Sequence, residues 1–294
     1  MNTNLENNSN NDDEIEMHNV HNKKNRLINK DFINKILKRF GITETVNDLD
    51  IWQRAFVHKS YCIHRKKTFK NEDFTVPVDG NTYIPLQEKS CESLEWLGDG
   101  IIQSITAQYL FGRYPEQNEG FLTKTRSKLV RTDGLSRFSR YLKFQKYIVM
   151  SKYMDNQGNG RENPKVLEDI FESFMGAMSL DLGKTYTDGY RICHNFMVQI
   201  YERVIDFAEL IQKDDNYKDQ LMRYCHQTFN GENPKYINSK IDSNGKERTY
   251  TEIIRDIGGT NKIVGKGVAR SRKEAQQEAA KKALKFYGVV TRVL

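Results

Sequence analysis

The chain has 294 residues and a formal net charge of +7, so it is long enough for two ordinary domains and favours a polyanionic partner. No apolar run approaches the roughly 20 residues that cross a bilayer, and the polar amino terminus is no signal peptide. The four cysteines lie far apart without a Cys-x-x-Cys pair, which argues against zinc or a disulfide framework. We therefore expect an intracellular protein, cytoplasmic or nuclear, that does not bind membranes.

The first half of the chain separates into a polar tail and a helical domain. Residues 1–30 are rich in Asn with almost no large apolar side chains, which predicts a disordered tail. Helical periodicity starts near Lys30, and no strand signal precedes residue 215, so we predict an all-α domain over residues 31–207. His58 lies at a predicted helix end without a nucleophile beside it, and we interpret it as a packing histidine.

Residues 62–90 interrupt this helical pattern. They begin with a basic cluster and continue with Pro77, Asp79-Gly80 and Pro85, which are turn formers that exclude a long helix. We predict a loop, and the family resemblance given below implies that it is an insertion. Two roles remain open for its basic cluster, contact with a nucleic acid or a merely solvated surface.

The helix predicted over residues 91–111 carries three carboxylates in one line. At about 100° per residue, Glu92, Glu95 and Asp99 fall within roughly 60° of one another. The opposite side is apolar and contains Leu94, Leu97, Ile101 and Ile105. Like charges at this spacing destabilise a helix, and no basic residue is interleaved. A structural role alone does not explain this pattern.

A second predicted helix, residues 166–180, repeats the arrangement. Asp169 and Glu172 stand three residues apart, and the apolar side contains Phe171, Phe174 and Met178. A single acidic pair is most simply a solvated helix face. Two acidic helices that pack together, however, would surround a divalent metal ion with oxygen ligands.

These motifs resemble those of the ribonuclease III family. The stretch from Glu92 to Asp99 is similar to the family signature Glu-x-x-Glu-x-Leu-Gly-Asp, and Asp169-x-x-Glu172-x-x-x-Gly176 resembles its second acidic motif. Three further stretches are similar to family motifs: Ala55 to Tyr61, Glu119-Gly120 and Leu129-Val130-Arg131. The motifs follow the family's order, and the resemblance covers roughly residues 33–205. The resemblance implies an endoribonuclease that hydrolyses double-stranded RNA and leaves 5′-phosphate and 3′-hydroxyl ends.

The resemblance also implies roles for individual acids. The expected Mg²⁺ ligands, with Mn²⁺ as an alternative ion, are Glu95, Asp99, Asp169 and Glu172. Asp99 and Glu172 are the expected catalytic residues among them. Glu92 and Glu119 are secondary acidic candidates.

Trp96 lies beside the acidic line rather than on the apolar side of its helix. The family commonly has Phe here, inserted into a pocket of a partner subunit, so we expect Trp96 to be a dimer contact. The alternative is a position in the core of its own chain.

One chain carries a single set of acids, whereas a duplex has two strands to cut. A two-fold homodimer supplies two sets.

The pattern changes after a linker predicted at residues 208–216. Residues 217–288 read as helix, three-stranded meander and helix, followed by a short tail at 289–294. This order resembles a double-stranded-RNA-binding domain. The predicted fold class is therefore an all-α ribonuclease III endonuclease domain plus a small α+β domain with the order α-β-β-β-α.

Basic residues crowd the end of the chain. Between residues 264 and 294, Lys and Arg outnumber Asp and Glu by eight to two. Ser271 and Glu274 form a capping box that predicts the start of the last helix. The expected RNA-binding residues are Lys266, Arg270, Arg272 and Lys273.

This second domain departs from the family in several places, one of which is a separation of Gly267 and Ser271 that is about two residues longer than usual. The loop from Ser243 to Arg248 lacks the family's Gly-Pro-x-His, Met222 stands where a polar contact residue is usual, and Gln276 replaces a basic residue. We therefore expect duplex binding with weakened minor-groove contacts.

Two functions other than an endoribonuclease are open. The first is a catalytically silent dimer that binds and sequesters or organises double-stranded RNA, although none of the four expected metal carboxylates is missing. The second is a metal phosphohydrolase that does not act on RNA, which the basic second domain disfavours.

Overall fold

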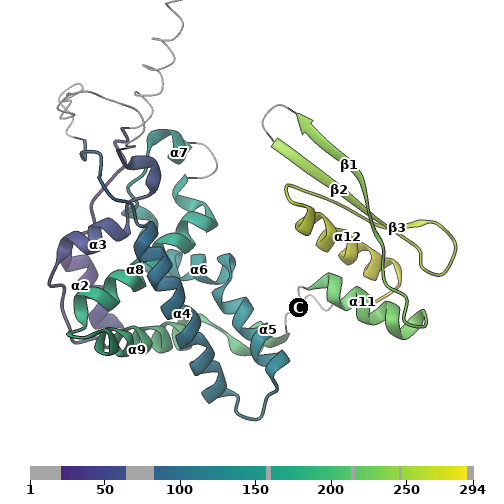
Figure 1. Ribbon diagram of the computed structural model, residues 1–294, viewed down its shortest axis with the longest axis horizontal. Coiled ribbons are helices and arrows are strands. Elements are labelled where there is room, and N and C mark those ends of the chain that lie inside the picture. Colours follow the sequence, from purple (N-terminus) through teal and green to yellow (C-terminus); the bar gives the residue numbers. More distant parts are fainter. Residues whose placement is uncertain (1–20, 64–82, 157–159, 213–215, 245–246, 290–294) are drawn as a thin grey trace, which may run out of the picture. The chain divides into compact units, whose positions relative to one another are not determined.

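The computed structural model describes residues 21–63, 83–156, 160–212, 216–244 and 247–289. The chain divides into two compact units between Asp206 and Phe207 (Figure 1). Each unit is described by itself below.

The first unit is helical, as predicted. Its described part contains no β-strand, only two isolated bridges, Val57 with Val149 and Cys62 with Gln87. The longer helices are α2 (Lys30–Arg39), α3 (Leu49–Ala55), α4 (Glu92–Arg113), α5 (Glu119–Val130), α6 (Thr132–Leu142), α7 (Lys152–Asn156), α8 (Pro164–Leu182) and α9 (Tyr186–Val204). Short 3₁₀ turns are η1 (Lys59–Tyr61), η2 (Phe144–Lys146) and η3 (Gly160–Glu162).

Helix α8 forms the centre of this unit (Figure 1). It packs against α3, α4, α6 and α9, and its residues are buried nearly all round. Phe174 is fully buried, and its ring lies 5.0 Å from that of Trp52, 4.7 Å from Phe144 and 5.7 Å from Phe196. An aromatic core therefore fixes the side of α8 that faces away from α4.

Helices α4 and α8 approach each other through two glycines. A Cβ atom on Gly98 would lie 1.8 Å from the backbone oxygen of Glu172, and one on Gly176 would lie 2.3 Å from that of Leu94. Any side chain at either position would force the helices apart. Both glycines belong to the acidic motifs, so the same residues that carry the carboxylates also set the helix spacing.

The polar tail ends earlier than we predicted. Residues 21–29 are described, and they lie against the first unit with Ile28, Asn22 and Asn25 buried. The prediction of disorder up to residue 30 is therefore wrong for this segment, whereas residues 1–20 lie outside the described residues.

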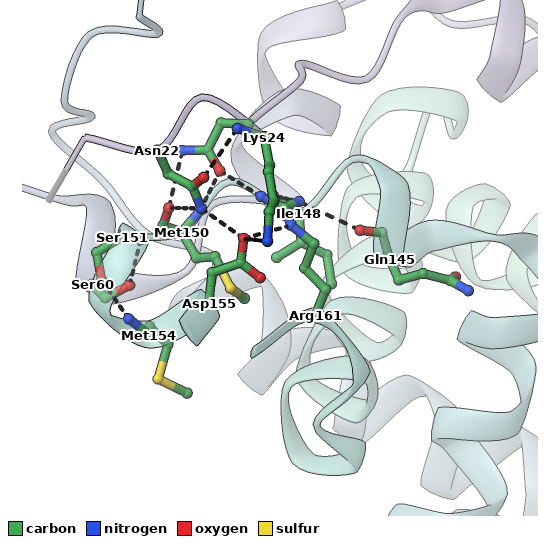
Figure 2. Close-up of polar contacts among 11 residues, drawn as sticks. Asn22, Lys24, Ser60, Gln145, Ile148, Met150, Ser151, Met154, Asp155 and Arg161 are labelled. Atoms are coloured by element: carbon green, nitrogen blue, oxygen red, sulfur yellow. Dashed lines mark hydrogen bonds and ion pairs between the residues drawn. The ribbon is translucent and has the colours of Figure 1, made fainter. Parts of the chain in front are cut away.

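Two asparagine amides attach this segment (Figure 2). Asn25 donates to the Met150 carbonyl at 3.0 Å and accepts from the Met150 amide at 3.1 Å. Asn22 donates to Asp155 at 2.9 Å, and Arg161 donates to Asp155 at 3.2 Å and to Asn25 at 2.8 Å. Amides that pair with backbone groups satisfy buried polar atoms. The composition of the tail could not reveal this, because the partners lie more than a hundred residues away.

Most of the predicted inserted loop, residues 64–82, lies outside the described residues. Hydrogen bonds join the two ends of this loop. The backbone N–H of Gln87 donates to the Tyr61 carbonyl at 3.0 Å, and the Tyr61 hydroxyl donates to the Ile84 carbonyl at 2.6 Å.

The second unit has the predicted helix-sheet-helix order. A short helix, α10 (Phe207–Gln212), occupies part of the segment predicted as a linker, and α11 (Tyr217–Thr228) follows. The antiparallel sheet has the order β1 (Tyr236–Asn244), β2 (Glu247–Arg255) and β3 (Ile263–Ala269), and α12 (Arg272–Phe286) covers it (Figure 1). A Cβ on Gly267 would lie 1.9 Å from the Ala275 oxygen, so the Gly-x-Gly sequence of β3 serves close packing on α12.

We predict that Gly98→Ala lowers the free energy of unfolding by about 3 kcal/mol, because its methyl group overlaps the backbone of α8. Thermal unfolding followed by circular dichroism measures the change. Gly112→Ala is the matched control, since it also lies in α4 but its Cβ would meet no atom within 4 Å. Equal stability of the two variants would contradict the proposed spacing constraint.

Candidate metal centre and nucleic-acid interface

Three carboxylates from two helices meet where α4 and α8 approach. Glu95 on α4 and Asp169 and Glu172 on α8 each place one oxygen within 4.8 Å of the others. Sequence spacing predicted the pair on α8. The close packing of α4 on α8 brings Glu95 to that pair.

Burial and mutual repulsion perturb these acids. Glu172 is only 5 % exposed, and burial, followed by the charges of Glu168 and Asp99, raises its pKa to about 8. Burial, followed by the charge of Asp169, also raises the pKa of Glu95. When burial and like charges oppose the ionisation of a group of acids, a nearby positive charge stabilises their ionised form.

Lys165 supplies part of that charge. Its ammonium group lies 2.8 Å from Asp169 Oδ1 and 3.1 Å from Glu168 Oε2. Neither oxygen, though buried, receives a well-directed hydrogen bond, so the contacts are ionic. Carboxylate oxygens of Glu95, Asp169 and Glu172 that lie within 4.8 Å of one another fit a hard divalent cation such as Mg²⁺ or Ca²⁺.

The fourth expected ligand, Asp99, lies outside the group of three. Its Oδ1 accepts a hydrogen bond from Gln103, one turn along α4, at 3.2 Å. Asp99 nevertheless contributes to the raised pKa of Glu172, which places its charge near the cluster.

The two secondary acids lie apart from the cluster. Glu92 is exposed, and hydrogen bonds from Ser90 at 3.0 Å and Lys59 at 3.3 Å lower its pKa. Glu119 is exposed at the start of α5 and accepts from the Thr123 hydroxyl at 2.9 Å.

Trp96 is 81 % exposed, which excludes the alternative of a core position in its own chain. It lines a shallow groove together with Leu97, Asp99, Gly100, Ile101 and Tyr190. Leu97, which belongs to the apolar side of the helix, is only partly buried. A large aromatic side chain beside an apolar groove is typical of an interaction surface.

The four expected RNA-binding residues of the second unit are all exposed. Lys266 lies in the middle of β3, Arg270 follows β3, and Arg272 and Lys273 begin α12. The Ser271 hydroxyl accepts from the Glu274 amide at 3.2 Å and caps α12, as predicted. Arg272 differs from its neighbours, because its Nε donates to Glu252 at 2.8 Å.

Comparison with known proteins identifies both units. The Ribonuclease III domain family matches residues 92–183, and the double-stranded RNA binding motif matches residues 217–287. Ribonuclease 3 of Streptococcus gordonii is 33 % identical over 85 % of this chain and 94 % of its own length. The chain belongs to the ribonuclease III family.

A second relative is the probable ribonuclease 3 of Acanthamoeba polyphaga mimivirus. It is 31 % identical over 92 % of this chain, which spans only 45 % of the viral protein's length. Among solved structures, the nuclease domain of ribonuclease III from Campylobacter jejuni matches 59 % of this chain at 22 % identity with a TM-score of 0.44.

No described helix is long and apolar enough to span a membrane.

As a member of the ribonuclease III family, the chain is an endoribonuclease with a double-stranded-RNA-binding motif.

Lys165 of the nuclease domain was not among the predicted site residues, although the sequence carries a signal for it. Lys165 stands four residues before Asp169 on the same helix, the spacing at which opposite charges attract.

The raised pKa of Glu172 predicts how stability depends on pH. Because the folded chain keeps a proton up to about pH 8 that the unfolded chain releases near its ordinary value of 4.5, stability in EDTA falls as pH rises between these values. A divalent cation bound by this cluster would favour the ionised form and stabilise the chain more at pH 8 than at pH 5. Thermal unfolding at both pH values measures this. Glu172→Gln should flatten the fall in EDTA, and an unchanged slope would contradict the assignment.

Proposed function

We propose that this ribonuclease III-family chain hydrolyses double-stranded RNA at the cluster of Glu95, Asp169 and Glu172, with Mg²⁺ as its ion. The convergence of these carboxylates within 4.8 Å carries the proposal. In the reaction, water attacks phosphorus while the bond to the 3′ oxygen breaks. The products then carry 5′-phosphate and 3′-hydroxyl ends.

Each residue in and around the cluster has its own role in this proposal. When bound, Mg²⁺ supplies positive charge at the phosphate and an acidified water, and Mn²⁺ supplies the same chemistry. Glu95, Asp99, Asp169 and Glu172 hold the ion in this proposal, and Asp99 and Glu172 are the catalytic pair. Lys165 balances the charge of Asp169 at 2.8 Å. Glu92, bound by Lys59, and Glu119 shape the margins of the acidic surface.

We further propose that the active form is a homodimer. One described nuclease unit carries one cluster, and cleavage of both strands requires two. The exposed ring of Trp96 and its neighbouring groove support a self-complementary contact on this face. Lys266, Arg270 and Lys273 of the second unit attract the duplex through its phosphates.

We predict that wild type cuts a long perfect RNA duplex in Mg²⁺ but not in EDTA. Glu172→Gln and Asp99→Asn should each slow cleavage at least about a hundredfold, because each removes charge that the ion and the transition state need. Gel analysis of single-turnover reactions measures the rates. The control Glu116→Gln removes an exposed charge outside the cluster and should leave the rate unchanged.

Two outcomes would redirect this proposal. A wild type that shifts the duplex on a native gel but leaves it intact would support the silent RNA-binding dimer. Cleavage that survives both substitutions would show that the ion binds elsewhere.

We predict that Trp96→Ser raises the dimer dissociation constant by about thirtyfold, as removal of a central aromatic contact typically does. Sedimentation velocity over a concentration series measures it. Phe111→Ser is the matched control, since Phe111 is 67 % exposed on the same helix but does not line the groove. Equal dimerisation of wild type and Trp96→Ser would exclude the proposed contact.

A further inference from the structure

A buried carboxylate lies beneath the start of α12 in the second unit. Glu252, in the middle of β2, has an exposed fraction of 0 %. Its Oε1 accepts from Arg272 Nε at 2.8 Å, and its Oε2 accepts from Gln276 Nε2 at 3.4 Å. Both oxygens are therefore bound by side chains from α12.

The network extends to the opposite helix. Gln276 accepts from the Lys218 ammonium group of α11 at 2.6 Å, and that group also lies 4.9 Å from the ring centre of Tyr236. Gln276 thus joins Lys218 to Glu252. The position where the family often has a base is used here for an internal contact.

Arg272 is constrained by this arrangement. Its side chain is 57 % exposed, but its charge is balanced by a carboxylate that has no access to water. Moving Arg272 onto a phosphate would leave Glu252 buried without its cation, which is strongly unfavourable. A phosphate that approaches Arg272 instead meets a neutral pair.

The neighbouring Lys273 is in a different situation. It stands in the same first turn of α12 and is exposed, and none of the contacts described for the second unit involves its ammonium group. Lys266 is likewise exposed on β3. These lysines can release counterions on binding a duplex, whereas the charge of Arg272 is already balanced by Glu252.

We propose that Glu252 acts as an internal counter-ion that withholds Arg272 from RNA and so limits the affinity of the second unit for duplexes. This inference rests on the proposed function, because it concerns the strength of duplex binding. It revises the expectation that Arg272 binds phosphate. Glu252 is thereby a positioning residue that tunes the RNA surface without touching RNA.

The test compares adjacent cations in the full-length chain. Binding to an RNA duplex of about 30 base pairs is measured in EDTA, to prevent cleavage, over a series of KCl concentrations. Lys273→Gln should flatten the slope of log K against log salt by about 0.9, the value for one lost phosphate contact. Arg272→Gln should change the slope by less than half of that.

The reverse substitution should release Arg272. Glu252→Gln should tighten binding about threefold to tenfold at moderate salt and steepen the slope by up to about 0.9. The double variant Glu252→Gln/Arg272→Gln should lose this gain. It leaves no carboxylate unpaired, so it keeps the comparison valid if Arg272→Gln alone does not fold, which circular dichroism would show.

Equal flattening by Arg272→Gln and Lys273→Gln would overturn the inference, as would a folded Glu252→Gln variant with unchanged or weaker binding. Both results would leave duplex binding itself intact. A wild-type chain that does not bind the duplex at all would contradict the proposed function instead.

Discussion

The contact between α4 and α8 is the constraint on which the nuclease unit depends. Gly98 and Gly176 let the two backbones approach so closely that a single methyl group would overlap a carbonyl oxygen. This approach brings Glu95 to Asp169 and Glu172. The aromatic core around Phe174 holds α8 from its other side, so hydrophobic packing offsets the repulsion among the acids. Stability and chemistry thus share one interface.

Charge compensation follows the same logic in both units, with different results. In the nuclease unit, Lys165 pairs with Asp169 of the cluster and Lys59 pairs with Glu92 outside it, yet the pKa of Glu172 stays raised. The remaining negative charge suits a divalent cation. In the second unit, the buried charge of Glu252 is balanced by Arg272 within the fold. The first arrangement leaves charge for a ligand to neutralise, whereas the second neutralises its own.

Polar contacts over long sequence distances are what the sequence could not predict. The segment from Asn22 to Asn25 looks like the rest of the polar tail, but it pairs with Met150 and Asp155. Arg272 is exposed at the start of α12, and it also contacts Glu252 on another element. Periodicity reports which face of a helix is apolar. It carries no information on which distant donor or acceptor a polar side chain finds.

The sequence by itself determined the family, the helical and α-β-β-β-α order of the two units, and the pairing of acids within each helix. These follow from local spacing, because residues three or four apart share a helix face. Only the tertiary structure decided that Glu95 joins Asp169 and Glu172. It alone decided that Trp96 is exposed and Arg272 is paired. The reason is that burial and partner choice depend on how separate elements pack.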